Sequence, residues 1–149
     1  MNKTRRKFVQ QGVVAGIITS LSIPYSAIAS WPDKAFKAKS VDEALNELLG
    51  SAESASGDIT IKAPTIAENG AVVPISVTSN VANTESISIV VVNNPQPLVV
   101  NFDVMGSEPY VSTRIKMAKT SKVIALVESD GKLYSSSVEV KVTIGGCGG

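Results

Sequence analysis

Polar and apolar residues alternate along most of the chain beyond residue 58, and this period of two is typical of β-strands with one buried face. The last segment shows the pattern best, because polar residues separate Val138, Val140 and Val142. Turn-forming residues, such as the pair Asp130-Gly131, interrupt the pattern at short intervals. The predicted strands span residues 59–63, 71–78, 86–92, 98–105, 110–116, 122–129 and 132–144.

Before residue 58 the apolar positions follow a helical period instead. The apolar residues of 41–49 fall on one stripe, Ser40 and Glu43 match a capping box, and Gly50 closes the segment, so we expect a short helix there. A short helix followed by seven strands predicts a mainly β fold, an immunoglobulin-like antiparallel β-sandwich. The cysteine pair and core tryptophan of antibody domains are missing, so the prediction concerns the architecture alone.

One predicted strand, 86–92, departs from the alternation because its apolar run is almost continuous. Such a run indicates either a strand buried on both faces or part of a partner interface. The sequence leaves both interpretations open.

The first 29 residues have the features of an export signal. Arg5 and Arg6 precede a mildly apolar segment, 12–23, and Ala27 and Ala29 form a small-x-small cleavage site. We predict a twin-arginine signal peptide over 1–29 and export of the folded protein to the periplasm. The apolar run is shorter than the roughly 20 residues of a membrane span, so no membrane anchor is expected. One domain, 30–144, and a C-terminal arm, 145–149, would follow.

Removing that segment changes the charge of the chain. It holds four of the 14 basic residues and none of the 13 acidic ones, so the net charge falls from +1 to about −3. Nucleic-acid binding would require a basic stripe that neutralises phosphates, and no such stripe is present.

The composition also excludes several classes of chemistry. There is no histidine and one cysteine, so neither a Ser–His nor a Cys–His catalytic pair is available. Zinc or copper would have to be held by carboxylates alone, which suits neither ion. We therefore expect no cofactor, no metal site and no catalytic residue of the chain's own.

The one cysteine, Cys147, stands in a distinctive place, between Gly145-Gly146 and Gly148-Gly149. Glycine adopts backbone conformations closed to other residues, so four glycines predict a flexible swinging arm for this thiol. Cys147 lies three positions after Ile144, which allows a reach of roughly 10 Å beyond the fold. The thiol has no activating neighbour, since Lys141 is six positions away, and this favours a substrate of enzymes over an enzyme.

Other interpretations of Cys147 remain open. A buried cysteine would need side chains around it, which the glycines do not supply. An intermolecular disulfide in an exported structural or assembly module is permitted by an odd cysteine, although four flanking glycines would only loosen it. Activation of a C-terminal diglycine, as in ubiquitin-like carriers, requires ATP and conflicts with an export signal.

Residues 142–149, Val-Thr-Ile-Gly-Gly-Cys-Gly-Gly, resemble the C-terminus of the SoxY family, the sulfur-carrier subunits of bacterial thiosulfate oxidation. Residues 67–74, 94–98 and 112–118 are also similar to stretches of that family. With the twin-arginine signal, the resemblance spans essentially the whole chain.

The resemblance implies a periplasmic carrier with an immunoglobulin-like fold that pairs with a SoxZ-like subunit. Cys147 would be the attachment site, and Gly145, Gly146, Gly148 and Gly149 would form the arm. A haem enzyme would join thiosulfate oxidatively to the thiol, a manganese-containing hydrolase would release the terminal sulfonate as sulfate, and a sulfur dehydrogenase would be a further possible partner. The redox and hydrolytic chemistry would belong to these partners.

The other similar stretches have less specific interpretations. Both prolines in residues 94–97 fix φ, which favours a rigid turn. Arg114 and Lys116 alternate with apolar residues, which predicts a solvated strand face, with contact to an anion or a partner as the second hypothesis.

Overall fold

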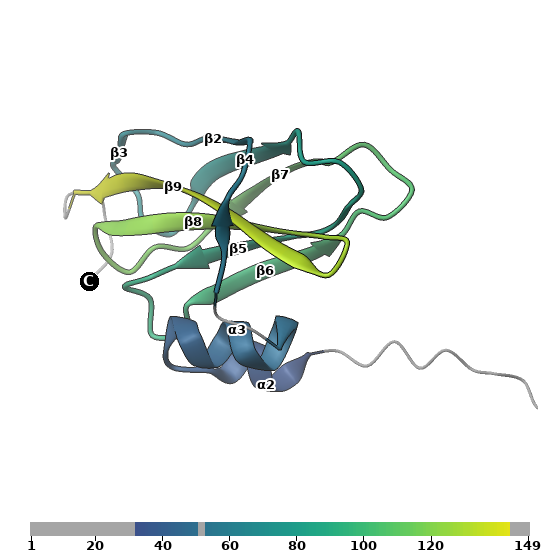
Figure 1. The fold of residues 1–149 in the computed structure, drawn as a ribbon. Coiled ribbons are helices and arrows are strands. Elements are labelled where there is room, and N and C mark those ends of the chain that lie inside the picture. Colours follow the sequence, from purple (N-terminus) through teal and green to yellow (C-terminus); the bar gives the residue numbers. More distant parts are fainter. Residues whose placement is uncertain (1–31, 51–52, 144–149) are drawn as a thin grey trace, which may run out of the picture. The chain divides into compact units, whose positions relative to one another are not determined.

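The computed structural model describes residues 32–50 and 53–143, all within one structural unit that begins at Pro32 (Figure 1). The predicted signal peptide, Ile144, Cys147 and its four flanking glycines lie outside the described residues. In the described part no helix is long and apolar enough to cross a membrane.

Two helices precede the strands. Helix α3 (Val41–Leu49) confirms the predicted helix: the Ser40 hydroxyl accepts a hydrogen bond from the Glu43 amide at 3.2 Å, and Gly50 ends the helix at φ 69°. Helix α2 (Asp33–Lys37) was not predicted. It is too short for a periodic pattern, and its one ion pair, between Lys37 and Asp33 at 2.6 Å, is exposed and contributes little.

The strands form two sheets. The larger sheet has the order β1-β9-β8-β5-β6, with β3 also paired to β9, and the smaller has the order β2-β4-β7. Strands β1 and β3 run parallel to β9, and all other described pairs are antiparallel. The strands are β1 (Ala55–Ser56), β2 (Ile59–Lys62), β3 (Ile66–Ala67), β4 (Val73–Ser79), β5 (Thr84–Val91), β6 (Leu98–Asp103), β7 (Tyr110–Ile115), β8 (Ser121–Ser129) and β9 (Lys132–Val142).

The main core lies between the two sheets, where inward residues of β4 and β7 pack with those of β5, β8 and β9. A second core lies between the helices and the other face of the large sheet, on the side of β5 and β6 (Figure 1). Ile89 belongs to the first core and Val90 to the second, and both are fully buried. The apolar run 86–92 is therefore explained by burial on both faces, except that Val92 at its end is 38% exposed.

The predicted mainly β class is confirmed, and each of the seven predicted strands has a counterpart within a few residues. The strand predicted to start at residue 71 begins at Val73, because Asn69 holds the chain in a turn through hydrogen bonds to the amides of Ala71 and Val72. The two-residue strands β1 and β3 were missed, since their pairing depends on β9 rather than on any pattern of their own.

Candidate functional site

The predicted site residues follow directly on β9, so the described part of the site is the place where this strand ends. The antiparallel ladder between β8 and β9 extends to the pair Ser121 and Val140. Beyond it, three consecutive backbone amides of β9 and the next residue remain hydrogen-bonded. The Lys141 amide donates to Thr65 O at 3.0 Å, and the Thr143 amide donates to Ala67 O at 3.1 Å.

The amide between them, that of Val142, points to the opposite side and donates to Thr120 Oγ1 at 2.9 Å. The same hydroxyl lies 3.4 Å from Val142 O, to which it donates. A threonine side chain therefore continues the ladder where the backbone of β8 has stopped. Because neighbours on both sides satisfy these amides, the strand is held through Thr143.

Two asparagines hold Thr120 and its loop in place. Asn93 donates from Nδ2 to Thr120 O at 2.9 Å, and its amide donates to Ser121 Oγ at 3.0 Å. Asn94 donates from Nδ2 to Lys116 O at 2.8 Å and accepts from the Ala118 amide at 2.9 Å. Each asparagine thus bridges the 93–97 turn to the segment that leads into β8. The predicted turn at residues 94–97 therefore also helps to hold the segment 116–121 in place.

Gly70 packs against the same strand end. The Met117 amide donates to Gly70 O at 2.7 Å, and a Cβ at position 70 would overlap Met117 O and lie 2.9 Å from Val142 Cγ1. A side chain therefore has no room there, which explains why glycine follows Asn69. We call Gly70, Asn94, Thr120, Val142 and Thr143 the tail base.

The tail base brings together the stretches that were singled out in the sequence. Gly70 belongs to residues 67–74 and Asn94 to 94–98, and Met117, whose amide donates to Gly70, belongs to 112–118. Arg114 and Lys116 are exposed at the end of β7, as a solvated strand face requires, and their contact with an anion or partner stays a prediction. Sequence reasoning missed Thr120, because nothing in its neighbourhood indicates a partner 22 positions away.

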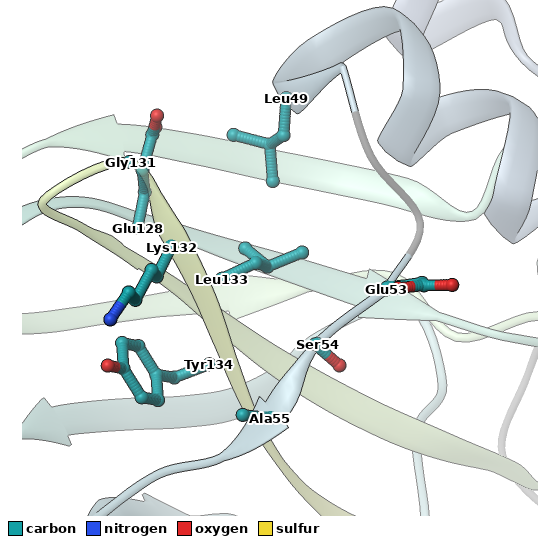
Figure 2. Close-up of a pocket in the computed structure, with 9 residues that line it drawn as sticks. All are labelled: Leu49, Glu53, Ser54, Ala55, Glu128, Gly131, Lys132, Leu133 and Tyr134. Atoms are coloured by element: carbon teal, nitrogen blue, oxygen red, sulfur yellow. The ribbon is translucent and has the colours of Figure 1, made fainter.

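A cavity of about 470 Å³ lies elsewhere, between the end of α3, β1 and the β8–β9 hairpin. Figure 2 shows Leu49 and Leu133 on its walls, whereas the charged ends of Glu53 and Lys132 point to opposite sides. No predicted site residue lines it. Within 32–50 and 53–143 there is also no cluster of three or more residues suited to hold a metal ion.

Comparison with known proteins identifies the family. The family model described as sulfur oxidation protein SoxY matches residues 45–147, which is more than half of the chain. The chain belongs to the SoxY family. A solved structure of the sulfur carrier protein SoxY from Chlorobium limicola f thiosulfatophilum is 44% identical in sequence, with a TM-score of 0.63, and the match covers 69% of this chain and 96% of that one.

The other comparisons add nothing to this. A chain from a structure of T cell activation by the superantigen toxic shock syndrome toxin-1 is 9% identical, with a TM-score of 0.44, and covers 59% of this chain and 100% of its own. That likeness is too low to bear on fold or function. The comparison with curated proteins found no match.

The SoxY match includes every residue of the tail base and reaches Cys147 itself. It begins inside α3, so α2 and the predicted signal peptide lie outside it. The part of the chain that the SoxY family shares is therefore the two-sheet fold together with the strand that leads to the cysteine.

Proposed function

We propose that this protein is a sulfur carrier that binds thiosulfate-derived intermediates covalently on Cys147 and presents them to partner enzymes. The observation that carries the proposal is the SoxY match, which extends through a strand held to its last described residue and ends on the one cysteine of the chain. The name of the similar solved structure, a sulfur carrier protein, supports the same role. The five residues 145–149 would act as the arm.

The proposed cycle has two chemical steps on Cys147, an oxidation and a hydrolysis. The Cys147 thiolate joins the outer sulfur of thiosulfate to give an S-thiosulfonate, and two electrons pass to a haem enzyme. With the help of a manganese-containing hydrolase, water then cleaves the S–S bond to the terminal sulfonate, which releases sulfate and one proton and leaves the persulfide –S–SH on Cys147. A sulfur dehydrogenase is a candidate for oxidising that sulfur. The carrier itself supplies no redox group, so it is acted upon rather than catalytic.

The setting is part of the same proposal. The Arg5-Arg6 motif supports export through the twin-arginine route to the periplasm, with boundaries at 1–29, 30–144 and 145–149. Two facing, mainly antiparallel sheets support an immunoglobulin-like sandwich. A SoxZ-like subunit is the expected companion, and the haem enzyme and hydrolase would meet the thiol in turn.

Intact-protein mass spectrometry tests the proposal. The protein is isolated from its native periplasm without reductant, and its mass is measured before and after reduction. We expect reducible additions of sulfur or thiosulfate mass that map to Cys147, and none in the Cys147→Ser variant. A homogeneous free thiol, or only a protein–protein disulfide, would replace the carrier with the alternative of a disulfide-linked assembly module.

A further inference from the structure

Charge is distributed very unevenly between the two ends of the strands. Four exposed lysines lie around the tail base, and we call them the lysine collar: Lys116, Lys119, Lys122 and Lys141. Lys119 precedes Thr120, Lys141 precedes Val142, and the Lys116 carbonyl accepts from Asn94. The acidic residues at this end are Glu68 and Glu139.

No collar lysine is neutralised by an ion pair within the described residues, where the one salt bridge joins Lys37 to Asp33. Lys122 and Glu139 are register partners on β8 and β9, but they form no salt bridge. The collar therefore keeps its charge directed at solvent.

The opposite end of the strands is acidic, and its acidic residues are Asp58, Glu85, Asp103, Glu108, Glu128 and Asp130. Several are placed there by direct contacts, since the Asp130 amide donates to Glu85 Oε1 at 3.2 Å and both Asp103 and Glu128 pair with Ser86. The lysine at this end is Lys132, the first residue of β9. Lys132 and Val142 of the tail base are the two ends of the 11-residue strand β9, about 35 Å apart at the usual rise per residue.

This uneven charge explains how a chain of negative net charge can still attract an anionic ligand to one end. The chain after the predicted signal peptide has a net charge of about −3, which repels sulfur oxyanions on average. Cys147, however, is tethered four residues beyond Thr143, a reach of about 13 Å. The acidic end lies about 35 Å from the tail base, so a tail of this length keeps the thiol closer to the collar than to the acidic end. At low salt, with a Debye length of about 30 Å at 0.01 M, the collar charges act across the whole reach of the tail.

We propose that the lysine collar concentrates sulfur oxyanions, free or bound through Cys147, around the thiol. The choice of sulfur oxyanions as the ligand rests on the proposed carrier function. The local positive electrostatic field of the collar does not depend on that function. The field raises the encounter rate of an anion with the thiol, and it does so less as salt increases.

The test compares two alkylating reagents on the reduced mature protein, together with any subunit that copurifies with it. Iodoacetate is an anion and iodoacetamide is neutral, and both react with the same thiolate, so the ratio of their rates removes any change in the thiol pKa. Cys147 is the one cysteine of the chain, which makes the reaction unambiguous. At about 20 mM salt we expect Lys119→Glu and Lys122→Glu each to lower the ratio about twofold, and the double variant about fourfold.

The matched control is Lys132→Glu, which changes the net charge equally at the acidic end. Its ratio should change by less than about 1.2-fold, and at 0.5 M salt all variants should converge. An unchanged ratio in the double variant would overturn the proposal, and so would an equal effect of Lys132→Glu, because net charge would then explain it. Absence of sulfur on native Cys147 would contradict the carrier function and leave this measurement intact, so the two failures are distinguishable. All three lysines are exposed, and circular dichroism verifies that the variants fold.

Discussion

The two ends of β9 are closed in different ways. At the β8–β9 hairpin the backbone closes the turn, because Asp130 and Gly131 have φ of 49° and 69° and Ser129 pairs directly with Lys132. The side chains of Asn83 and Glu85 add hydrogen bonds to Asp130. At the tail base, side chains of Asn94 and Thr120 make the bonds that a regular ladder lacks.

Contacts from other segments reach both ends of the strand. At the hairpin they add to a turn that the backbone has already closed, whereas at the tail base they replace bonds that the ladder no longer supplies. Ser129 and Lys132, which close the hairpin, are three positions apart in the sequence. The hydrogen bonds of the tail base join residues that are at least 22 positions apart, so they keep the last described residues of β9 from fraying.

Replacing Cys147 by serine should produce the largest functional effect and no effect on either strand end. We expect sulfur-dependent turnover of the reconstituted system to be abolished, because a hydroxyl cannot form the proposed bond to sulfur. The thermal midpoint should stay unchanged, since all described core contacts remain. Oxygen or electron-acceptor consumption with thiosulfate measures the first, and calorimetry the second. Retained turnover in the variant would eliminate Cys147 as the attachment site.

Two glycine substitutions compare the ends directly. Gly70→Ala should reduce the free energy of unfolding by about 2 to 3 kcal/mol, because the new Cβ overlaps Met117 O and the packed backbone has to move. Gly131→Ala should cost about 1 kcal/mol, because open space surrounds it and the cost lies in its positive φ alone. Urea denaturation measures both. Equal losses would mean that the tail base tolerates displacement as readily as the hairpin.

Sequence reasoning succeeded where the determinants are local. The Asp130-Gly131 pair predicted the hairpin, and Ser40 with Gly50 predicted α3 within a residue. Alternation predicted the mainly β class, because a strand between a core and water displays its period directly.

The features that the sequence did not predict depend on contacts between residues far apart in the chain. Strand β3 forms because the carbonyls of Thr65 and Ala67 accept hydrogen bonds from the amides of Lys141 and Thr143, and no pattern in residues 65–67 predicts that pairing. Residues at the tail base were singled out by family resemblance before their contacts were known, but Thr120 was not. Cys147 was predicted from its unusual neighbours and lies outside the described residues, so its role stays a prediction.

The smallest expected effect comes from Thr120, whose side chain bonds the Val142 amide where the backbone ladder has ended. Thr120→Val keeps the shape of the residue but removes the hydroxyl, which leaves the Val142 amide without its partner and should cost about 1 kcal/mol. We therefore expect hydrogen exchange of the Val142 amide to accelerate about fivefold, while the Leu133 amide near the hairpin keeps its wild-type rate. Thr120→Ser retains the hydroxyl and should exchange at close to the wild-type rate. If Val142 exchanged equally in all three proteins, the bonds from Thr65 and Ala67 on the other side would be sufficient to hold the strand end. A selective change at Val142 would instead show that the hydroxyl of Thr120 is needed to hold the last described residues of β9.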